Sequence, residues 1–152
     1  MIPGRFEYHQ PGDIPAAVAL LADLGDDARI IAGGHSLIPM MKLRLARPDH
    51  LIDLRAIGDL RFIRVADGVV TIGAMTTQHA LISDAALASA APIVREAALQ
   101  IADPQVRYVG TIGGNVANGD PGNDMPGLMQ CLDATFTLHG PSGVRQLSLI
   151  HI

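Results

Sequence analysis

The residues of this sequence best suited to chemistry lie in two glycine-rich segments, and both favour binding of a phosphate-containing ligand. The first segment, residues 32–37, reads Ala-Gly-Gly-His-Ser-Leu. Two adjacent glycines permit positive φ angles and a close approach of a ligand to the backbone. The helix that we expect from Leu37 would leave its first N–H groups free to bind pyrophosphate. For this segment alone, a tight turn with Ser36 as the helix cap is an equally good interpretation.

The second segment, residues 110–124, belongs to a glycine- and asparagine-rich stretch between Gln105 and Pro126. We expect this stretch to be a long loop without regular structure, and such loops are usually functional or disordered. It offers backbone N–H donors, short hydroxyl and amide side chains, and the acceptor Asp124. A flexible surface loop is the alternative interpretation. Neither segment has the spacing G-x-G-x-x-G or a following G-K-[ST], so the two commonest nucleotide motifs are excluded.

Composition narrows the classes of function. Hydrophobic residues make up 49% of the 152 residues and charged residues 17%, as expected for one folded domain. Aromatic residues are only 3%, tryptophan is absent and the net charge is -4. Stacking platforms for single-stranded nucleic acid and a basic surface for a phosphate backbone are therefore both missing, and no nucleic-acid partner is expected.

The single cysteine, Cys131, excludes an intrachain disulfide, a cysteine-ligated iron–sulfur cluster and a multi-cysteine zinc site within this sequence. A reducing, cytoplasmic location fits best. Cys131 itself is expected to be a small buried core residue, and so are Met40 and Met41. The six histidines show no metal-like spacing, so we predict no metal site. No apolar stretch approaches the roughly 20 residues of a membrane span.

The elements that position the first segment form a βαβ-type lobe, which we assign to residues 1–56. Strands are expected at residues 6–9, 29–32 and 50–54. Asp13 is placed to cap a helix that ends near Gly25. A second helix is expected at residues 37–45.

The second lobe, residues 57–146, should contain an antiparallel sheet. Residues 62–65 and 69–72 flank Asp67-Gly68, a two-residue hairpin signal. The alanine-rich stretch 83–102 is expected to be helical, with Asp84 as a cap and Pro92 starting or breaking a helix. Residues 128–132 complete another helix, and residues 135–138 and 144–147 form a second hairpin. Residues 147–152 lose the pattern and are treated as a possible non-native tail.

The two glycine segments together resemble the flavin-binding signatures of the FAD subunit of molybdenum hydroxylases, the family that includes aerobic carbon monoxide dehydrogenase and xanthine dehydrogenase. In that family the first signature continues as P-x-M-K-x-R-L-x-x-P-x-x-L-I-D-L, which is matched from Pro39 to Leu54. The second signature, D-P-Q-V-R-x-x-G-T-I-G-G-[NS], is matched from Asp103 to Asn115. The resemblance covers residues 1–146 and implies the α+β, two-lobed FAD-binding domain of the PCMH (vanillyl-alcohol oxidase-like) type, with both glycine segments facing one cleft.

The resemblance also implies roles for individual residues in binding FAD. Asp124 would accept hydrogen bonds from a ribose or ribityl hydroxyl, and Ile101 would pack against the flavin. Thr111, Gly114 and Asn115 would hold the region between phosphate and ribityl chain. The first signature would wrap the pyrophosphate through backbone N–H groups and one hydroxyl, and comprises Ala32, Gly33, Gly34, His35, Ser36 and Leu37. No catalytic side chain is implied.

The function implied by the resemblance is electron transfer. FAD would pass electrons from iron–sulfur clusters to NAD, quinone or oxygen, with a molybdenum-cofactor large subunit and an iron–sulfur small subunit as partners. Because the family continues beyond this length, we expect a truncated second lobe and self-association through residues 135–147 or weak FAD binding. Two alternatives stay open, namely a flavin-free assembly module of the same fold and a stand-alone flavin oxidase.

Overall fold

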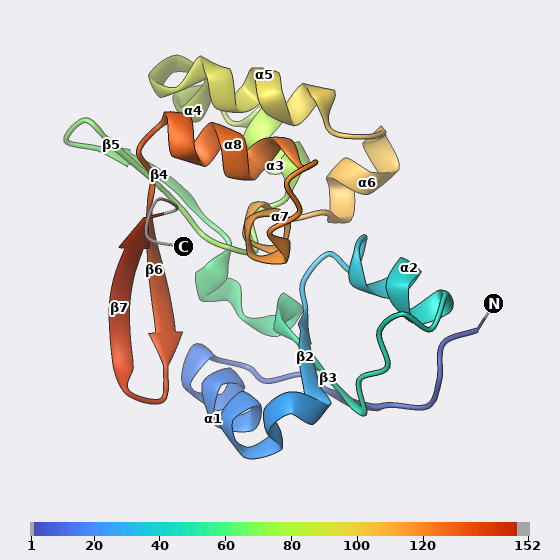
Figure 1. Ribbon diagram of the computed structural model, residues 1–152. Coiled ribbons are helices and arrows are strands. Elements are labelled where there is room, and N and C mark those ends of the chain that lie inside the picture. Colours follow the sequence, from blue (N-terminus) through green and yellow to red (C-terminus); the bar gives the residue numbers. More distant parts are fainter. Residues whose placement is uncertain (1, 149–152) are drawn as a thin grey trace.

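The computed structural model describes residues 2–148 and shows two lobes, one below the other in Figure 1. The lower lobe is built on a parallel three-stranded sheet in the order β1-β3-β2, so the expected βαβ architecture is confirmed. Its elements are β1 (Glu7–His9), α1 (Ile14–Leu24), β2 (Ala28–Ile31), α2 (Leu37–Lys42) and β3 (His50–Asp53), with 3-10 turns at Gly25–Asp27, Leu54–Ala56 and Gly58–Leu60.

The lower lobe forms because local signals and apolar burial agree. The Asp13 side chain caps α1 by accepting a hydrogen bond from the Ala16 N–H, and α1 ends at Gly25, whose φ is 54°. Apolar residues lie on both faces of the sheet in two separate clusters. One contains Ala17, Ala28, Ile52 and Ile57, and the other contains Ile31, Met41 and Leu51. Alternation along β3 therefore gives each helix its own side of the sheet.

The upper lobe combines six helices with two antiparallel hairpins, all within residues 2–148 (Figure 1). The hairpins are separate two-stranded ribbons that do not pair with each other. The elements are β4 (Ile63–Ala66), β5 (Val69–Ile72), α3 (Gln78–Ser83), α4 (Ala85–Ala90), α5 (Pro92–Gln100), α6 (Pro104–Val109), α7 (Ile112–Asn118), α8 (Asp124–Cys131), β6 (Thr135–Gly140) and β7 (Gly143–Ser148). The β6–β7 hairpin descends beside α1.

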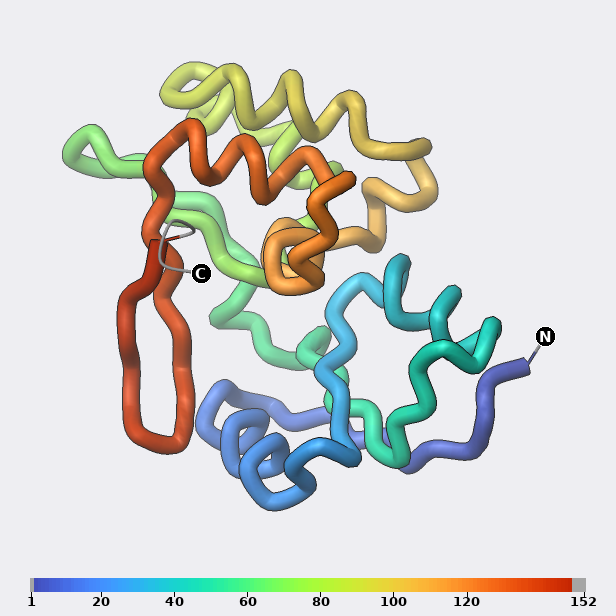
Figure 2. The backbone as a smooth tube through the Cα atoms, viewed as in Figure 1, coloured from blue at the N-terminus to red at the C-terminus, as the bar shows by residue number. Residues whose placement is uncertain are grey.

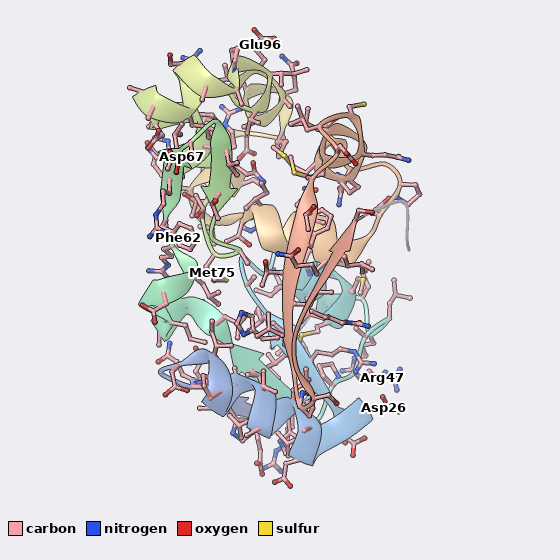
Figure 3. All side chains as sticks on the ribbon, turned by 90° about the vertical axis from the view of Figure 1, so that its left-hand side faces the viewer. Asp26, Arg47, Phe62, Asp67, Met75 and Glu96 are labelled. Carbon is pink, nitrogen blue, oxygen red and sulfur yellow. The ribbon has the colours of Figure 1, made fainter. Side chains whose placement is uncertain are left out.

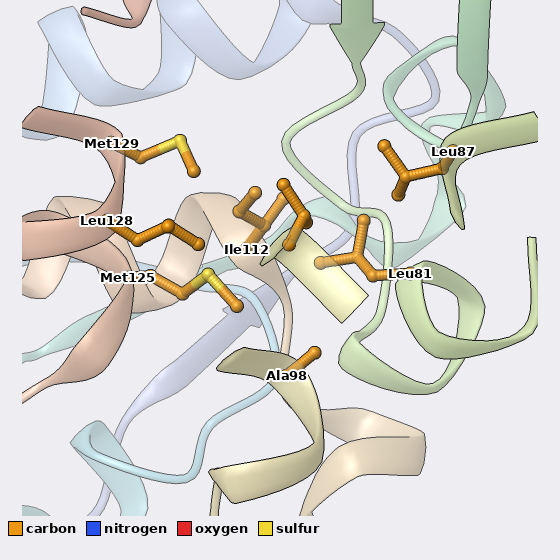
Figure 4. Packing of buried hydrophobic residues seen from close by; sticks show 8 residues of the cluster. Leu81, Leu87, Ala98, Ile112, Met125, Leu128 and Met129 are labelled. Carbon is orange, nitrogen blue, oxygen red and sulfur yellow. The ribbon is translucent and has the colours of Figure 1, made fainter. Parts of the chain in front are cut away.

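The upper lobe is held together by one apolar core. Figure 4 shows Leu81, Leu87 and Ile112 directed toward the side chains that α8 contributes, among them Met125 and Met129. Met125, Leu81 and Leu87 are 0% exposed, and burial of one such side chain stabilises the fold by about 1.5–3 kcal/mol. Pro92 starts α5, and Asp84 caps α4 through the Leu87 N–H.

Four expectations are corrected by the structure. The stretch 105–126 is largely helical, because Asp103 and Thr111 cap α6 and α7 with their side chains. Ser36 precedes α2 but makes no capping hydrogen bond with its side chain. Cys131 is exposed, since α8 turns Met125, Leu128 and Met129 toward the core instead.

Met40 is the fourth correction, because 38% of it is exposed whereas Met41 is buried. Of the possible tail, Leu147 and Ser148 belong to β7, and residues 149–152 lie outside the part that the structure describes. No helix in residues 2–148 is long and apolar enough to cross a bilayer.

Candidate functional site

The two glycine segments lie against each other at the boundary between the lobes. Figure 2 shows the chain after β2 rising toward the segment that contains α6 and α7. A β-carbon placed on Gly33 would lie 2.5 Å from the Val109 carbonyl oxygen and 2.8 Å from the Gly110 α-carbon. One placed on Gly114 would lie 3.3 Å from the Ala32 β-carbon. Glycine is therefore required at position 33, where two backbones touch, whereas the neighbours of Gly114 are side-chain atoms of Thr111 and Ala32.

Gly33 and Gly34 have different structural roles in the first segment. Gly34 has a φ of 73° and supplies the left-handed conformation that turns the chain into α2. Gly33 has no positive φ, so its role is close approach alone, and what approaches is the backbone at Val109 rather than open space. Of the two properties that the sequence allowed for this pair, positive φ is found at Gly34 and close approach at Gly33.

The first segment presents a row of free hydrogen-bond donors. Within residues 2–148, no hydrogen bond is donated by the backbone N–H groups from Gly33 to Leu37. These residues are half-buried or exposed, so they do not belong to the buried core. Consecutive N–H donors around a turn form a concave site for an anion. The segment can accept a phosphate without any Lys or Arg.

The start of α7 behaves differently, because its backbone N–H groups already have partners. Ile112 and Gly113 donate to the carbonyl oxygens of Thr76 and Ala74, at 3.0 and 2.9 Å. Gly114 donates to the Thr111 hydroxyl, and Asn115 donates to the Thr111 carbonyl. The second segment therefore contributes side chains and a supporting wall, while the first contributes the free backbone donors.

Within the described residues, the Asn115 side chain of the second segment has an acceptor atom without a hydrogen-bond partner. Its Oδ1 atom is buried and has no hydrogen-bond partner within the described residues, which is uncommon for a buried acceptor. Its carbonyl oxygen accepts a hydrogen bond from the Asn123 side chain at 3.4 Å. That contact joins α7 to the start of α8, where Asp124 is exposed in the first turn. Asn115 Oδ1 is therefore a candidate acceptor for a hydrogen bond from a polar ligand.

A supporting segment, residues 74–78, was not recognised in the sequence. It follows β5 and carries three of the contacts that fix the second signature, including a hydrogen bond from the Gln78 N–H to the Gly110 carbonyl at 2.9 Å. Thr76 and Gln78 are 4% and 1% exposed, although both are polar. The only signal of this supporting role in the sequence is that the polar residues Thr76 and Gln78 follow the apolar residues Ala74 and Met75.

Two of the predicted site residues lie apart from the contact between the signatures. Ile101 ends α5 and packs against the core of the upper lobe. His35 is exposed, and its Nδ1 lies 2.9 Å from the Gly33 carbonyl oxygen, so it closes the turn locally. The structure brings Ala32 and Gly33 together with Val109, Gly110 and Gly114. Asn123, which precedes Asp124, is hydrogen-bonded to the Asn115 carbonyl oxygen.

A separate open hollow of about 430 Å³ is lined in part by the supporting segment, through Met75, Thr76 and Thr77. Phe62 and Met75 line it and are labelled in Figure 3, between the hairpin that carries Asp67 and the lobe that carries Asp26. None of the predicted site residues lines this hollow. We therefore place the candidate site at the two glycine segments.

A charged network anchors β3, the strand at the end of the first signature. Asp53 is 0% exposed; its Oδ2 accepts a hydrogen bond from the Tyr8 hydroxyl at 2.6 Å and forms an ion pair with Arg55 Nε at 2.7 Å. The hydrogen bond to Asp53, followed by burial, raises the pKa of Tyr8 above its usual value. The buried carboxylate thus ties β1 to β3 and to the turn after β3.

The fold and the paired glycine segments define a flavin-binding class of domain. The sequence profile of the family described as "FAD binding domain in molybdopterin dehydrogenase" matches residues 4–151. The chain belongs to this family, and FAD is the cofactor that its domains bind.

The most informative relatives are medium chains of carbon monoxide dehydrogenase. The medium chain from Afipia carboxidovorans is 67% identical over 145 residues, which are 95% of this chain and 50% of the relative. The xanthine dehydrogenase FAD-binding subunit of Escherichia coli O157:H7 is 36% identical, over 91% of this chain and 47% of the relative. The solved carbon monoxide dehydrogenase from Hydrogenophaga pseudoflava superposes with a TM-score of 0.97 at 55% identity, over 99% of this chain and 52% of the other. The chain therefore spans about half the length of these relatives.

The residues present fit FAD. A dinucleotide with a pyrophosphate needs backbone donors, and the first segment offers them between Gly33 and Leu37. Its sugar and ribityl hydroxyls need acceptors, which the Asp124 carboxylate and the unpaired Asn115 Oδ1 supply. Residues 32–37, Thr111, Gly114, Asn115 and Asp124 are the groups we expect to hold it.

Proposed function

We propose that this chain is the FAD-holding part of the flavin subunit of a molybdenum hydroxylase. The observation that carries the proposal is the contact of Gly33 with Val109 and Gly110, which puts the free N–H donors of the first signature beside the second. Two signatures that are remote in sequence thereby form one polar site. FAD, when bound there, supplies a centre that can take up and release electrons.

The chain's own residues act by binding and orientation. The N–H groups from Gly33 to Leu37 bind the pyrophosphate, because a concave row of backbone dipoles stabilises negative charge. The Thr111 hydroxyl is held by the Gly114 N–H at 3.1 Å, which leaves its proton free to be donated. Asn115 and Asp124 orient the sugar and ribityl hydroxyls. Ile101, on the core of the upper lobe, is proposed to support the flavin side of the site.

In the complete enzyme, we propose that electrons reach this site from iron–sulfur clusters and leave for NAD, a quinone or oxygen. The partners would be a molybdenum-cofactor large subunit and an iron–sulfur small subunit, in the cytoplasm. Among substrates, carbon monoxide is favoured because two medium chains of carbon monoxide dehydrogenase are 67% and 56% identical to this chain. Self-association through residues 135–147 stays a prediction.

A titration with three flavins tests the proposed site. FAD, FMN and riboflavin share the isoalloxazine ring, but only FAD has a pyrophosphate. We expect FAD to bind at least about tenfold more tightly than riboflavin, equivalent to about 1.4 kcal/mol, and ADP to compete. The measurement is the change in flavin fluorescence on addition of protein. Absence of flavin binding would favour the flavin-free assembly module, and equal affinity for FAD and riboflavin would refute the pyrophosphate cradle.

A further inference from the structure

Three side chains with metal-binding atoms converge at the edge of the parallel sheet, away from the glycine segments. Glu7 and His9 belong to β1, and His50 belongs to β3. The parallel register pairs Glu7 with His50, and residues two apart on a strand point to the same face. The three side chains therefore share one face of neighbouring strands.

The distances within this group match the ligand spacing of a small metal ion. His9 Nε2 lies 3.2 Å from His50 Nδ1, and His50 Nδ1 lies 3.5 Å from Glu7 Oε2. One ligand atom from each residue lies within 4.8 Å of the other two. A tetrahedral zinc ion with bonds of about 2.0–2.2 Å separates its ligand atoms by about 3.3–3.5 Å. Two of the three separations, at 3.2 and 3.5 Å, are within about 0.1 Å of that range.

Hydrogen bonding alone leaves the group incompletely satisfied. His50 Nδ1 faces both an imidazole nitrogen and a carboxylate oxygen. If this atom carries a proton, it can donate fully to only one of them, and if it carries a lone pair, it faces the negative carboxylate. A cation between the three atoms would accept a lone pair from each at once.

We propose that Glu7, His9 and His50 bind one divalent transition-metal ion of the zinc class. Two imidazoles and one carboxylate are ligands that Zn²⁺ takes readily, with water in the fourth position. The exposed Glu7 side chain, at 74%, gives the ion access from solvent. The ion would fasten β1, a three-residue edge strand, to the central strand β3. Its role is to stabilise the sheet and involves no reaction step.

The test uses the tag-free 152-residue chain and Zn²⁺ in isothermal titration calorimetry. We expect one ion per chain, and at least about tenfold weaker binding in His9→Gln and in His50→Gln. His139→Gln is the matched control, because His139 is exposed on β6 and outside the group. Co²⁺ in place of Zn²⁺ should give the visible absorption of a tetrahedral site in the unaltered chain and the control only.

Thermal unfolding gives a second readout. Zn²⁺ should raise the unfolding midpoint of the unaltered chain and of His139→Gln, but not of His9→Gln, because binding to the folded state stabilises it. If His50→Gln does not fold, His9→Gln and Glu7→Gln carry the test. Binding that is absent from the unaltered chain, or equally strong in all variants, would overturn the proposal and leave these residues as a hydrogen-bonded surface group.

Discussion

Gly33 lies so close to Val109 that a β-carbon at Gly33 would come within 2.5 Å of the Val109 carbonyl oxygen. The contact joins the loop after β2 to the end of α6, and it involves backbone on both sides. Neither partner can therefore move aside as a side chain would. We therefore expect this contact to fix the orientation of the free donors of the first segment.

Gly33→Ala should separate the two signatures. The added methyl group meets backbone atoms at 2.5 and 2.8 Å, and overpacking of this kind costs about 1–3 kcal/mol. We expect FAD affinity to fall at least about tenfold. Flavin titration and circular dichroism at the same temperature measure affinity and folding separately. Unchanged FAD binding in a folded Gly33→Ala protein would show that the contact does not shape the site.

Gly127→Ala is the matched control and should have the opposite effect on stability. Gly127 lies inside α8, has no positive φ, and would direct a β-carbon into open space. Replacement of a helical glycine by alanine stabilises by about 0.5–1 kcal/mol. Urea unfolding should show this gain, with FAD affinity unchanged. A loss of stability would mean that α8 packs more tightly at this position than the structure shows.

Thr111→Ala should loosen the start of α7, whereas Thr111→Ser should not. The Thr111 hydroxyl accepts the Gly114 N–H at 3.1 Å, and loss of such a cap costs about 1 kcal/mol. Serine retains the hydroxyl, so its unfolding midpoint should stay near that of the unaltered chain. FAD affinity should follow the same order. Equal stability of both variants would show that the Thr111 hydroxyl cap does not stabilise α7.

Tyr8→Phe should destabilise the lower lobe in a pH-dependent manner. Loss of the 2.6 Å hydrogen bond to Asp53 should cost about 1 kcal/mol near neutral pH, because Tyr8 is partly exposed. The folded state raises the pKa of Tyr8, so this stabilisation is present below the unfolded value of about 10 and is lost as the pH rises above it. The difference in unfolding free energy between the two proteins should therefore shrink from about pH 9 to about pH 11. A difference that grows over this range would contradict the assigned hydrogen bond.

Much of the fold could be predicted from the sequence because local signals and tertiary packing agree. Asp13 and Asp84 cap helices as expected, and Asp67-Gly68 turns the first hairpin with φ angles of 51° and 75°. The helix α7 was missed because its glycine and asparagine content disfavours helix, whereas α6 contains neither residue and is only six residues long. Caps at Asp103 and Thr111, and carbonyl oxygens from residues 74–76, stabilise them instead.

The candidate site was only partly predictable for the same reason. The two signatures could be recognised, and the structure brings them into contact, but the partner of Gly33 is a backbone segment that no local pattern identifies. Glu7, His9 and His50 are a second case. The two histidines are 41 positions apart in the sequence, so their proximity is not evident until the strand register is known.

The contact at Gly33 also sets an order of events during synthesis. The lower lobe has its own apolar clusters and emerges from the ribosome first, so it can fold before residues 109–115 exist. The free backbone N–H groups of residues 33–37 then face water, because residues 109–115 are not yet present beside them. If the two glycine segments hold the flavin together, we expect the cofactor to be captured only after the later helices have docked, as a late step in the maturation of this protein.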